Sequence, residues 1–367
     1  MMLKIKIGEV CDVYDGPHAT PKKIDKGPVY LGIDAITDNG KLNPSGYNYL
    51  SEEDYKIWTK RVTPQYGDLV FSYEATLGRY ALIPKDFYGC LGRRLAVVRP
   101  KDKRINIKWL YYYFLSPEWS VYIANNTVKG STVNRISIED FPNFYIPLLE
   151  RTEQDKIVKV LSAIDEKIDN NVNINDNLQS QLRLIYENMI AKANSNQIKG
   201  NFVTVKEMAD ITTGKEDANF STVNGKYKFF TCSNVPLQCD EYAFESSSIL
   251  IAGNGDFNVK YYSGKFNAYQ RTCVLTASSE YYAILYLACL YQVNLFKSNS
   301  SGSIVKFITK SDVENIPLFI PDDISLLQKL NNLLHFQEQN ILENDKLIQL
   351  RDFLLPMLMN GQATIDN

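Results

Sequence analysis

A long-range internal repeat constrains the fold of this chain more than any other feature. Residues 130–147 read GSTVNRISIEDFPNFYIP, and residues 302–321 read GSIVKFITKSDVENIPLFIP. Four residues of the first segment, Gly130, Ser131, Val133 and Asp140, recur in the same order in the second, and both segments close on Ile-Pro. Such a recurrence indicates that one structural unit occurs twice.

The two halves also correspond in the order of their other patterns. An alternating segment that ends in a Gly turn comes first, then an apolar strand with a Gly-containing loop, a basic loop that enters a β-branched strand, and a short apolar helix. The corresponding pairs are 6–16 with 204–214, 66–84 with 247–265, 92–100 with 270–277, and 109–117 with 281–289. Each half is therefore predicted to be β-rich with one or two small helices.

After each Ile-Pro pair the apolar pattern changes to a heptad. In residues 150–192 the steps alternate between four and three, without a Gly or Pro, through Ile157, Leu161, Ile164, Ile168, Asn171, Asn175, Leu178, Leu182, Ile185 and Met189. At 1.5 Å per residue such a helix is roughly 60 Å long. A helix of this length extends beyond a small domain, which favours a coiled-coil partner over the alternative of a long amphipathic core helix.

The same chain supplies that partner. From Leu327 onward the second heptad places Leu330, Leu334, Gln337, Ile341, Asn344, Ile348, Arg351, Leu355 and Leu358 on one seam. Pro356 is expected to end or kink this helix near its last turn. Both seams are polar in the middle, and buried amides fix register and partner because mispairing them against apolar residues is costly. The predicted register residues are Asn171, Asn175, Gln337 and Asn344; water exposure of these positions stays an open alternative.

These patterns predict an α+β fold with an approximate two-fold internal repeat. Two β-rich domains are separated by two long helices that form an antiparallel coiled coil. The expected segments are a first domain at 1–150, a first helix at 151–198, a second domain at 199–321 and a second helix at 322–367.

Composition excludes several classes of protein. The net charge is −2, and the acidic excess lies in the last segment, so a basic face on either domain remains possible. No apolar run is long enough for a membrane span, the first residues do not form a signal peptide, and the Cys pattern indicates buried thiols in the cytoplasm. The chain contains no GxxxxGK[ST] loop, no Asn/Asp-Pro-Pro-aromatic motif and only two His residues, so we expect no catalytic residue and no metal site.

The order of the motifs resembles the DNA specificity (S) subunit of type I restriction–modification enzymes. The resemblance covers the whole chain and is carried by VYDGPHATPKKIDKGPVYLGIDAI (13–36), GDLVFSYEATLG (67–78), the 130–157 exit into the first helix with Gln154, and LLPMLMNGQATI (354–365). The second half departs from the pattern. It has no equivalent of DGPHATP, and ISLLQKL replaces ERTEQDKI, so that Gln328 is the match for Gln154.

The resemblance implies a non-catalytic subunit that reads an asymmetric bipartite site in double-stranded DNA, one half-site per domain. It further implies two modification subunits that methylate adenine at N6, and restriction subunits that cleave and translocate DNA. S-adenosylmethionine and ATP are then expected on those partners, with no cofactor on this chain.

Base readout requires Arg, Lys, Asn, Gln or Ser on loops that can enter a groove. The candidates in the first domain are Tyr73, Arg79, Arg93, Arg94, Lys129, Ser131 and Arg135. The candidates in the second domain are Asn254, Asn258, Lys260, Tyr269, Gln270, Arg271, Ser301 and Lys306. Phosphate contacts, which position a protein without reading sequence, are expected from Lys22, Lys23, Lys101, Lys103 and Arg104.

Three other classes of function remain as alternatives. A stand-alone two-module DNA-binding regulator would share the loops and the helices. A coiled-coil assembly scaffold is disfavoured by the basic loops, and an enzyme by the missing catalytic motifs. A methyltransferase partner would separate a specificity subunit from a regulator.

Overall fold

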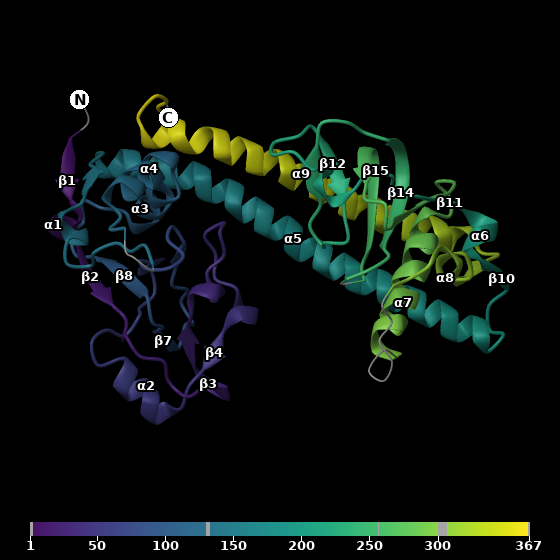
Figure 1. Cartoon of the computed structure of the whole chain (residues 1–367), viewed down its shortest axis with the longest axis horizontal. Helices are drawn as coiled ribbons and strands as arrows, with labels where there is room; N and C mark the ends of the chain where they lie inside the picture. The colour runs from purple at the N-terminus through teal and green to yellow at the C-terminus, as the bar shows by residue number, and fades with distance from the viewer. Residues whose placement is uncertain (1–2, 130–132, 256, 300–306, 366–367) are drawn as a thin grey trace. The chain divides into compact units, whose positions relative to one another are not determined.

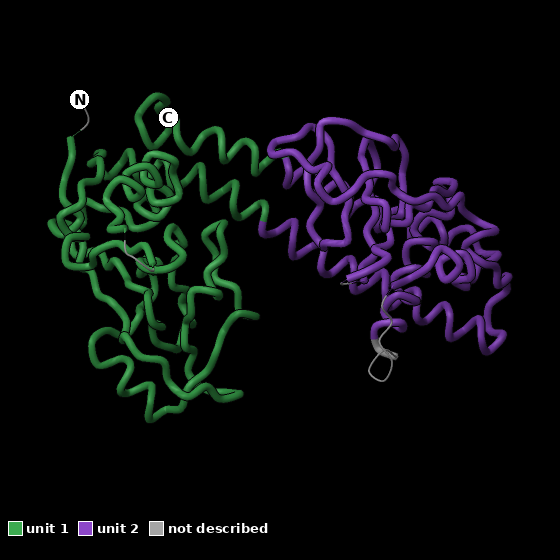
Figure 2. Tube along the Cα trace, viewed as in Figure 1, with its two compact units in different colours: residues 1–168, 346–367 green, residues 169–345 purple. Residues whose placement is uncertain are grey.

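The computed structural model describes residues 3–129, 133–255, 257–299 and 307–365. The chain forms two compact units, residues 1–168 with 346–367 and residues 169–345 (Figure 2). Helices α5 (Arg151–Asn194) and α9 (Ile324–Met359) each contribute to both units (Figure 1). The boundary between the two units therefore falls within each long helix, whereas the segments predicted from the sequence assign each long helix to a segment of its own.

The described residues of unit 1 form three small sheets. The four-stranded sheet has the order β2 (Cys11–Asp15), β8 (Leu95–Pro100), β5 (Leu69–Ser72), β6 (Tyr80–Leu82), and all its pairs are antiparallel. The second has the order β4 (Asn48–Tyr49), β3 (Ile24–Leu31), β7 (Gly89–Leu91), and the third pairs β1 (Lys4–Lys6) with β9 (Tyr145–Pro147). The helices before α5 are α1 (Ile7–Val10), α2 (Glu52–Trp58), α3 (Ile107–Phe114) and α4 (Pro117–Asn126).

Unit 2 is built on one six-stranded sheet. Its order is β11 (Asp210–Thr213), β16 (Thr272–Thr276), β14 (Phe244–Ala252), β15 (Val259–Ala268), β12 (Tyr227–Phe230), β13 (Leu237–Cys239). A separate ladder pairs β10 (Gly200–Thr204) with β17 (Pro317–Pro321). The helices between α5 and α9 are α6 (Val205–Met208), α7 (Tyr282–Asn299) and α8 (Lys310–Glu314).

The predicted repeat is confirmed by equivalent backbone hydrogen bonds in the two units. In unit 1 the N–H of Tyr73 donates to the carbonyl of Arg94 at 3.1 Å, and the N–H of Ile136 donates to the carbonyl of Tyr73 at 2.7 Å. In unit 2 the corresponding bonds run from Gly253 to Arg271 at 2.9 Å and from Ile308 to Gly253 at 2.8 Å. The α+β class and the duplicated architecture are as predicted.

The segments 6–16 and 204–214 differ from the prediction of a single alternating strand. Each is interrupted by one helical turn, α1 or α6. The Glu9 carboxylate accepts a hydrogen bond from the N–H of Lys6 at 3.2 Å, and Glu207 accepts one from the N–H of Thr204 at 2.7 Å. A Glu three residues after the start of a turn caps the free N–H groups, and this local bonding overrides the alternation.

Stacked aromatic rings form part of the core of unit 1. The rings of Phe114 and Trp119 stack with centroids 4.3 Å apart, and those of Phe71 and Phe141 stack at 4.5 Å. In unit 2 the buried face of the sheet packs on α7, in which residues 282–289 are buried. No helix among the described residues has both the length and the apolar content needed to cross a bilayer.

Within each unit α5 and α9 run antiparallel. In unit 2 Asn171 bonds to Asn344 while Asn175, one turn later, bonds to Gln337. In unit 1 the Arg351 guanidinium pairs with Asp165 at 3.2 Å. All ten predicted seam positions of α5 are buried or half-buried.

The seam of α9 is only partly as predicted. Ile341 and Ile348 are 42% and 38% exposed, so they lie outside the seam. Asn340 is buried instead, and its Nδ2 donates to the Oδ1 of Asn175 at 2.8 Å. The step from Gln337 to the next core residue is therefore three rather than four, because the side chain of Asn340 bonds to the half-buried amide of Asn175.

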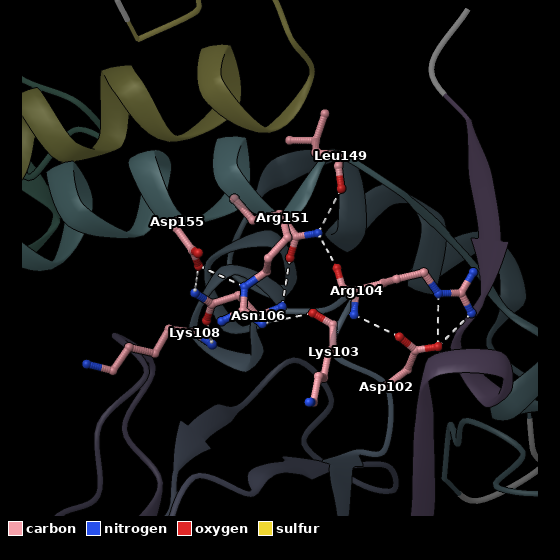
Figure 3. A network of polar contacts seen from close by, with 9 residues as sticks. Asp102, Lys103, Arg104, Asn106, Lys108, Leu149, Arg151 and Asp155 are labelled. Atoms are coloured by element: carbon pink, nitrogen blue, oxygen red, sulfur yellow. Dashed lines mark hydrogen bonds and ion pairs between the residues drawn. The ribbon is translucent and has the colours of Figure 1, made fainter. Parts of the chain in front are cut away.

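A side-chain amide joins each β-rich domain to the long helix that follows it, and this amide is buried at Gln154 in unit 1 and half-buried at Asn331 in unit 2. In unit 1 the Gln154 Nε2 donates to the carbonyls of Arg104 and Leu149, and its Oε1 accepts from the N–H of Asn106 at 2.7 Å. Around it, Arg151 and Asn106 both bond to the Asp155 carboxylate (Figure 3).

Asn331 makes the equivalent contact in unit 2. Its Oδ1 accepts from the N–H of Ala283 at 2.9 Å and its Nδ2 donates to the carbonyl of Glu280 at 2.6 Å. Gln328, the match expected from the sequence, is exposed. The bonding amide lies one turn further along α9 than Gln328. The side chain of Asn is shorter than that of Gln, so it must start from a different turn to reach the N-terminus of α7.

Candidate nucleic-acid interface

Three loops of unit 1 meet where β5 ends and β8 begins. The loop after β5 contacts the loop before β8 through the bond between Tyr73 and Arg94. It contacts the 128–135 segment through the bond from the Ala75 N–H to the Asn134 carbonyl at 3.3 Å and through an isolated bridge between Glu74 and Arg135. The fold thus brings together candidates from all three predicted loops.

The side chains of these loops differ in how they are held. Arg94 Nε donates to Glu74 Oε1 at 3.0 Å. Arg79 pairs with Asp38 at 3.0 Å and donates to the carbonyl of Ile33 at 3.2 Å. The Asp38 side chain is 87% exposed, and an exposed ion pair of this kind is worth only about 0–1 kcal/mol, so Arg79 can exchange it for another anion.

The remaining candidates of unit 1 divide into exposed and buried residues. Arg93, Lys129 and Arg135 are exposed, and Lys129 borders a surface cavity of about 500 Å³ next to Gly78. Tyr73 is 4% exposed and belongs to the hydrophobic core. Its position favours a packing role over a base contact, and Ser131 lies outside the described residues.

In unit 2 the equivalent loops gather around the end of β12. Asn258 Nδ2 donates to the carbonyl of Cys232 at 2.8 Å, and Lys260 Nζ donates to the carbonyl of Thr231 at 3.2 Å and to the Oδ1 of Asn258. The Asn254 amide oxygen accepts from the thiol of Cys232. These contacts hold three predicted side chains in one cluster.

The loop before β16 supplies the exposed members of this cluster. Gln270 and Arg271 are exposed, Tyr269 is half-buried, and the N–H of Gln270 donates to the carbonyl of Glu216 at 2.9 Å. The Arg271 side chain makes no hydrogen bond or ion pair with any residue that the structure describes. Ser301 and Lys306 lie outside the described ranges.

The residues predicted to contact phosphate lie on unit 1 and are exposed. Lys101 pairs with Asp12 at 2.9 Å, and Arg104 pairs with Asp102 at 2.8 Å, whereas Lys22, Lys23 and Lys103 are exposed without an ion pair to the described residues. Hydrogen bonds from Arg104 lower the pKa of the Asp102 carboxyl.

Sequence reasoning missed the acidic and carbonyl partners of these side chains. Glu74 and Asp38 hold two of the arginines, and the carbonyls of Thr231 and Cys232 hold Lys260 and Asn258. Glu74 directly follows a predicted candidate in the sequence, but only the folded loops bring it to Arg94. Across the described ranges no three His, Cys, Asp or Glu side chains form a group suited to a metal ion.

Both clusters present N–H donors on loops at the end of a sheet. Guanidinium, ammonium and amide groups of this kind can bond to phosphate oxygens and to the acceptors on base edges. These side chains are therefore suited to binding an anionic polymer that is rich in hydrogen-bond acceptors.

Comparison with known proteins agrees with this chemistry. The family described as "Type I restriction modification DNA specificity domain" matches residues 2–180 and 197–350. The specificity subunit of the type I restriction enzyme EcoDI from Escherichia coli is 34% identical over 169 residues, which are 44% of this chain and 38% of that protein. The match thus spans less than half of that relative.

Two further similarities cover most of the chain. The specificity subunit of the type I restriction enzyme MjaIX from Methanocaldococcus jannaschii is 22% identical over 364 residues, 88% of this chain and 83% of its own length. The crystal structure of the type I restriction–modification S subunit from M. genitalium has a TM-score of 0.61 at 19% identity, covering 98% of this chain and 96% of that one. The similarity to the M. genitalium structure shows the fold alone.

Proposed function

Because the chain belongs to the family of type I restriction–modification DNA specificity domains, we propose that it recognises a bipartite, asymmetric site in double-stranded DNA. Each β-rich domain reads one half-site. The observation that carries this proposal is the recurrence of the same pair of bonded loops in both units, marked by the bonds from Tyr73 to Arg94 and from Gly253 to Arg271.

The side chains of each cluster suit both kinds of DNA contact. Arg93, Arg94 and Arg135 of unit 1, and Gln270 and Arg271 of unit 2, can reach base-edge acceptors, and a good bidentate contact is worth about 1–3 kcal/mol of discrimination. Lys101, Lys103 and Arg104 suit phosphate, which adds affinity that falls steeply with salt. The two clusters carry different side chains, and different half-sites follow from that difference.

The proposed partners are two modification subunits, which methylate adenine at N6, and restriction subunits. In this proposal S-adenosylmethionine and ATP bind those partners, while this chain acts in the cytoplasm without performing chemistry. Helix α9 exposes large apolar side chains in both units, Phe336, Ile341 and Leu342 in unit 2 and Ile348, Leu350 and Phe353 in unit 1, and exposed apolar groups suit protein docking. Exposed apolar groups on a long helix lose contact with water when a partner covers them.

A domain exchange tests the proposal. Residues 1–150 are replaced by the corresponding domain of another specificity subunit, and bound sequences are selected from a random duplex pool with the full-length chain and its modification subunit. The proposal predicts that one part of the selected motif changes and the other part stays the same. A change in both parts, or the absence of any two-part motif, would contradict it.

A further inference from the structure

The two units carry chemically different side chains at a structurally equivalent position beside Arg94 and Arg271. Tyr73 and Gly253 make the same backbone bond to Arg94 and Arg271. Two residues later, Ala75 and Gly255 share the left-handed conformation, with φ of 68° and 70°. The residues between them, Glu74 and Asn254, therefore occupy the same place in the loop.

The exchange of a carboxylate for an amide changes the state of the neighbouring arginine. In unit 1 Glu74 holds Arg94 at 3.0 Å, and the two side chains are 24% and 31% exposed. In unit 2 the Asn254 amide turns to the thiol of Cys232, and the exposed Arg271 side chain has no partner in the part of the chain that the structure describes. One arginine is therefore fixed and paired, whereas the other has no side-chain partner among the described residues.

Two consequences follow for binding to DNA. A fixed guanidinium loses less rotamer freedom when it meets a base edge, so discrimination between bases improves. The paired carboxylate also cancels one positive charge near the phosphates, which weakens binding that does not depend on sequence. An arginine without such a partner loses more rotamer freedom on binding, and its full positive charge strengthens binding that does not depend on sequence.

From this geometry we propose that Glu74 is a positioning residue that sets the specificity of the first half-site. It orients Arg94 toward the bases and suppresses the sequence-independent attraction of Arg94 to phosphate. Asn254 leaves Arg271 unrestrained, so the second half-site gains more of its affinity from phosphate. This inference rests on the proposed DNA-binding function.

The main test is Glu74→Gln, which keeps the size of the side chain and removes its charge. We expect binding to a duplex with a scrambled first half-site to tighten, and the ratio of cognate to scrambled affinity to fall roughly five-fold or more. The slope of log affinity against log salt should steepen by about 0.9, the value of one additional phosphate contact. Glu53→Gln, an equal charge change on the exposed face of α2, should leave the ratio unchanged.

Two more variants show whether Glu74 acts through Arg94. In an Arg94→Ala background, Glu74→Gln should have no further effect on the ratio of cognate to scrambled affinity. Asn254→Glu should make the salt slope shallower by about 0.9 and weaken binding to a duplex with a scrambled second half-site.

The outcomes separate this inference from the proposed function. If the wild-type chain binds its selected duplex no better than a scrambled one, the proposed function fails. If the wild-type chain discriminates but Glu74→Gln keeps the wild-type ratio and slope, or changes the ratio equally in the Arg94→Ala background, only the role of Glu74 is overturned.

Discussion

The Nδ2 of Asn171 in α5 donates a hydrogen bond to the Oδ1 of Asn344 in α9 at 2.8 Å. The same amide also donates to the carboxylate of Glu343 at 2.7 Å. Asn171 is fully buried. A buried amide that finds partners in only one pairing of two helices selects that pairing over those that place it against apolar residues.

Replacing Asn171 with Leu should therefore destabilise the protein by about 1–3 kcal/mol, because the polar groups of α9 lose their partner while remaining partly buried. Denaturant unfolding followed by helix circular dichroism measures this loss. Asn170→Leu, on the exposed side of the same turn, is the matched control and should change stability little. Equal stability of the two variants would show that the Asn171 bonds do not fix the pairing.

The Gln154 amide should contribute as much to the stability of the first domain as Asn171 contributes to the pairing of the helices. Gln154→Met keeps the length of the side chain but leaves two carbonyls and one N–H without their partner, so we expect a loss of about 1–3 kcal/mol. Hydrogen exchange should show faster opening at Asn106, whose N–H loses its acceptor. Lys159→Met, an exposed change further along α5, should leave that exchange rate unaltered.

Glu338 should make stability depend on pH. Burial raises the pKa of its carboxyl, and hydrogen bonds from Tyr282 and Ser263 offset this only in part. The folded state therefore binds the proton more tightly than the unfolded chain does, and the stability gained from this is present at low pH and lost as pH rises through the folded-state pKa.

Glu338→Gln removes this ionisation. The variant should be more stable than the wild type at pH 7, and its advantage should shrink as the pH falls through the carboxyl range. Unfolding midpoints at both pH values measure this, with the exposed Glu241→Gln as control. An advantage that is independent of pH would contradict the raised pKa.

The parts of the fold that follow from periodicity could be predicted from the sequence. The heptad of α5 is visible because burial on one face of a long helix repeats every three and four residues. The repeat is visible because equivalent strands need equivalent patterns. The shift from Ile341 to Asn340 in α9 could not be predicted, since it depends on the position of Asn175 across the interface.

The candidate site was predictable at the level of loops but not of contacts. A basic residue beside a Gly turn predicts a loop suited to DNA contact. Arg94 is paired because the pairing of β5 with β8 brings Glu74, 20 residues away in the chain, to its side chain, whereas Arg271 has no side-chain partner among the described residues. The burial of Tyr73 could not be predicted either, because it depends on the residues that pack around it and not on its neighbours in sequence.

We propose that each unit reads its own half-site through its own loop cluster. Selection from a random duplex pool with the wild type, Arg94→Ala and Arg271→Ala, each with the modification subunit, distinguishes the two clusters. We expect a two-part motif in which Arg94→Ala weakens preference in one part and Arg271→Ala in the other, each by about 1–3 kcal/mol. A single continuous motif, or the same part weakened by both variants, would show that the two clusters do not read separate half-sites.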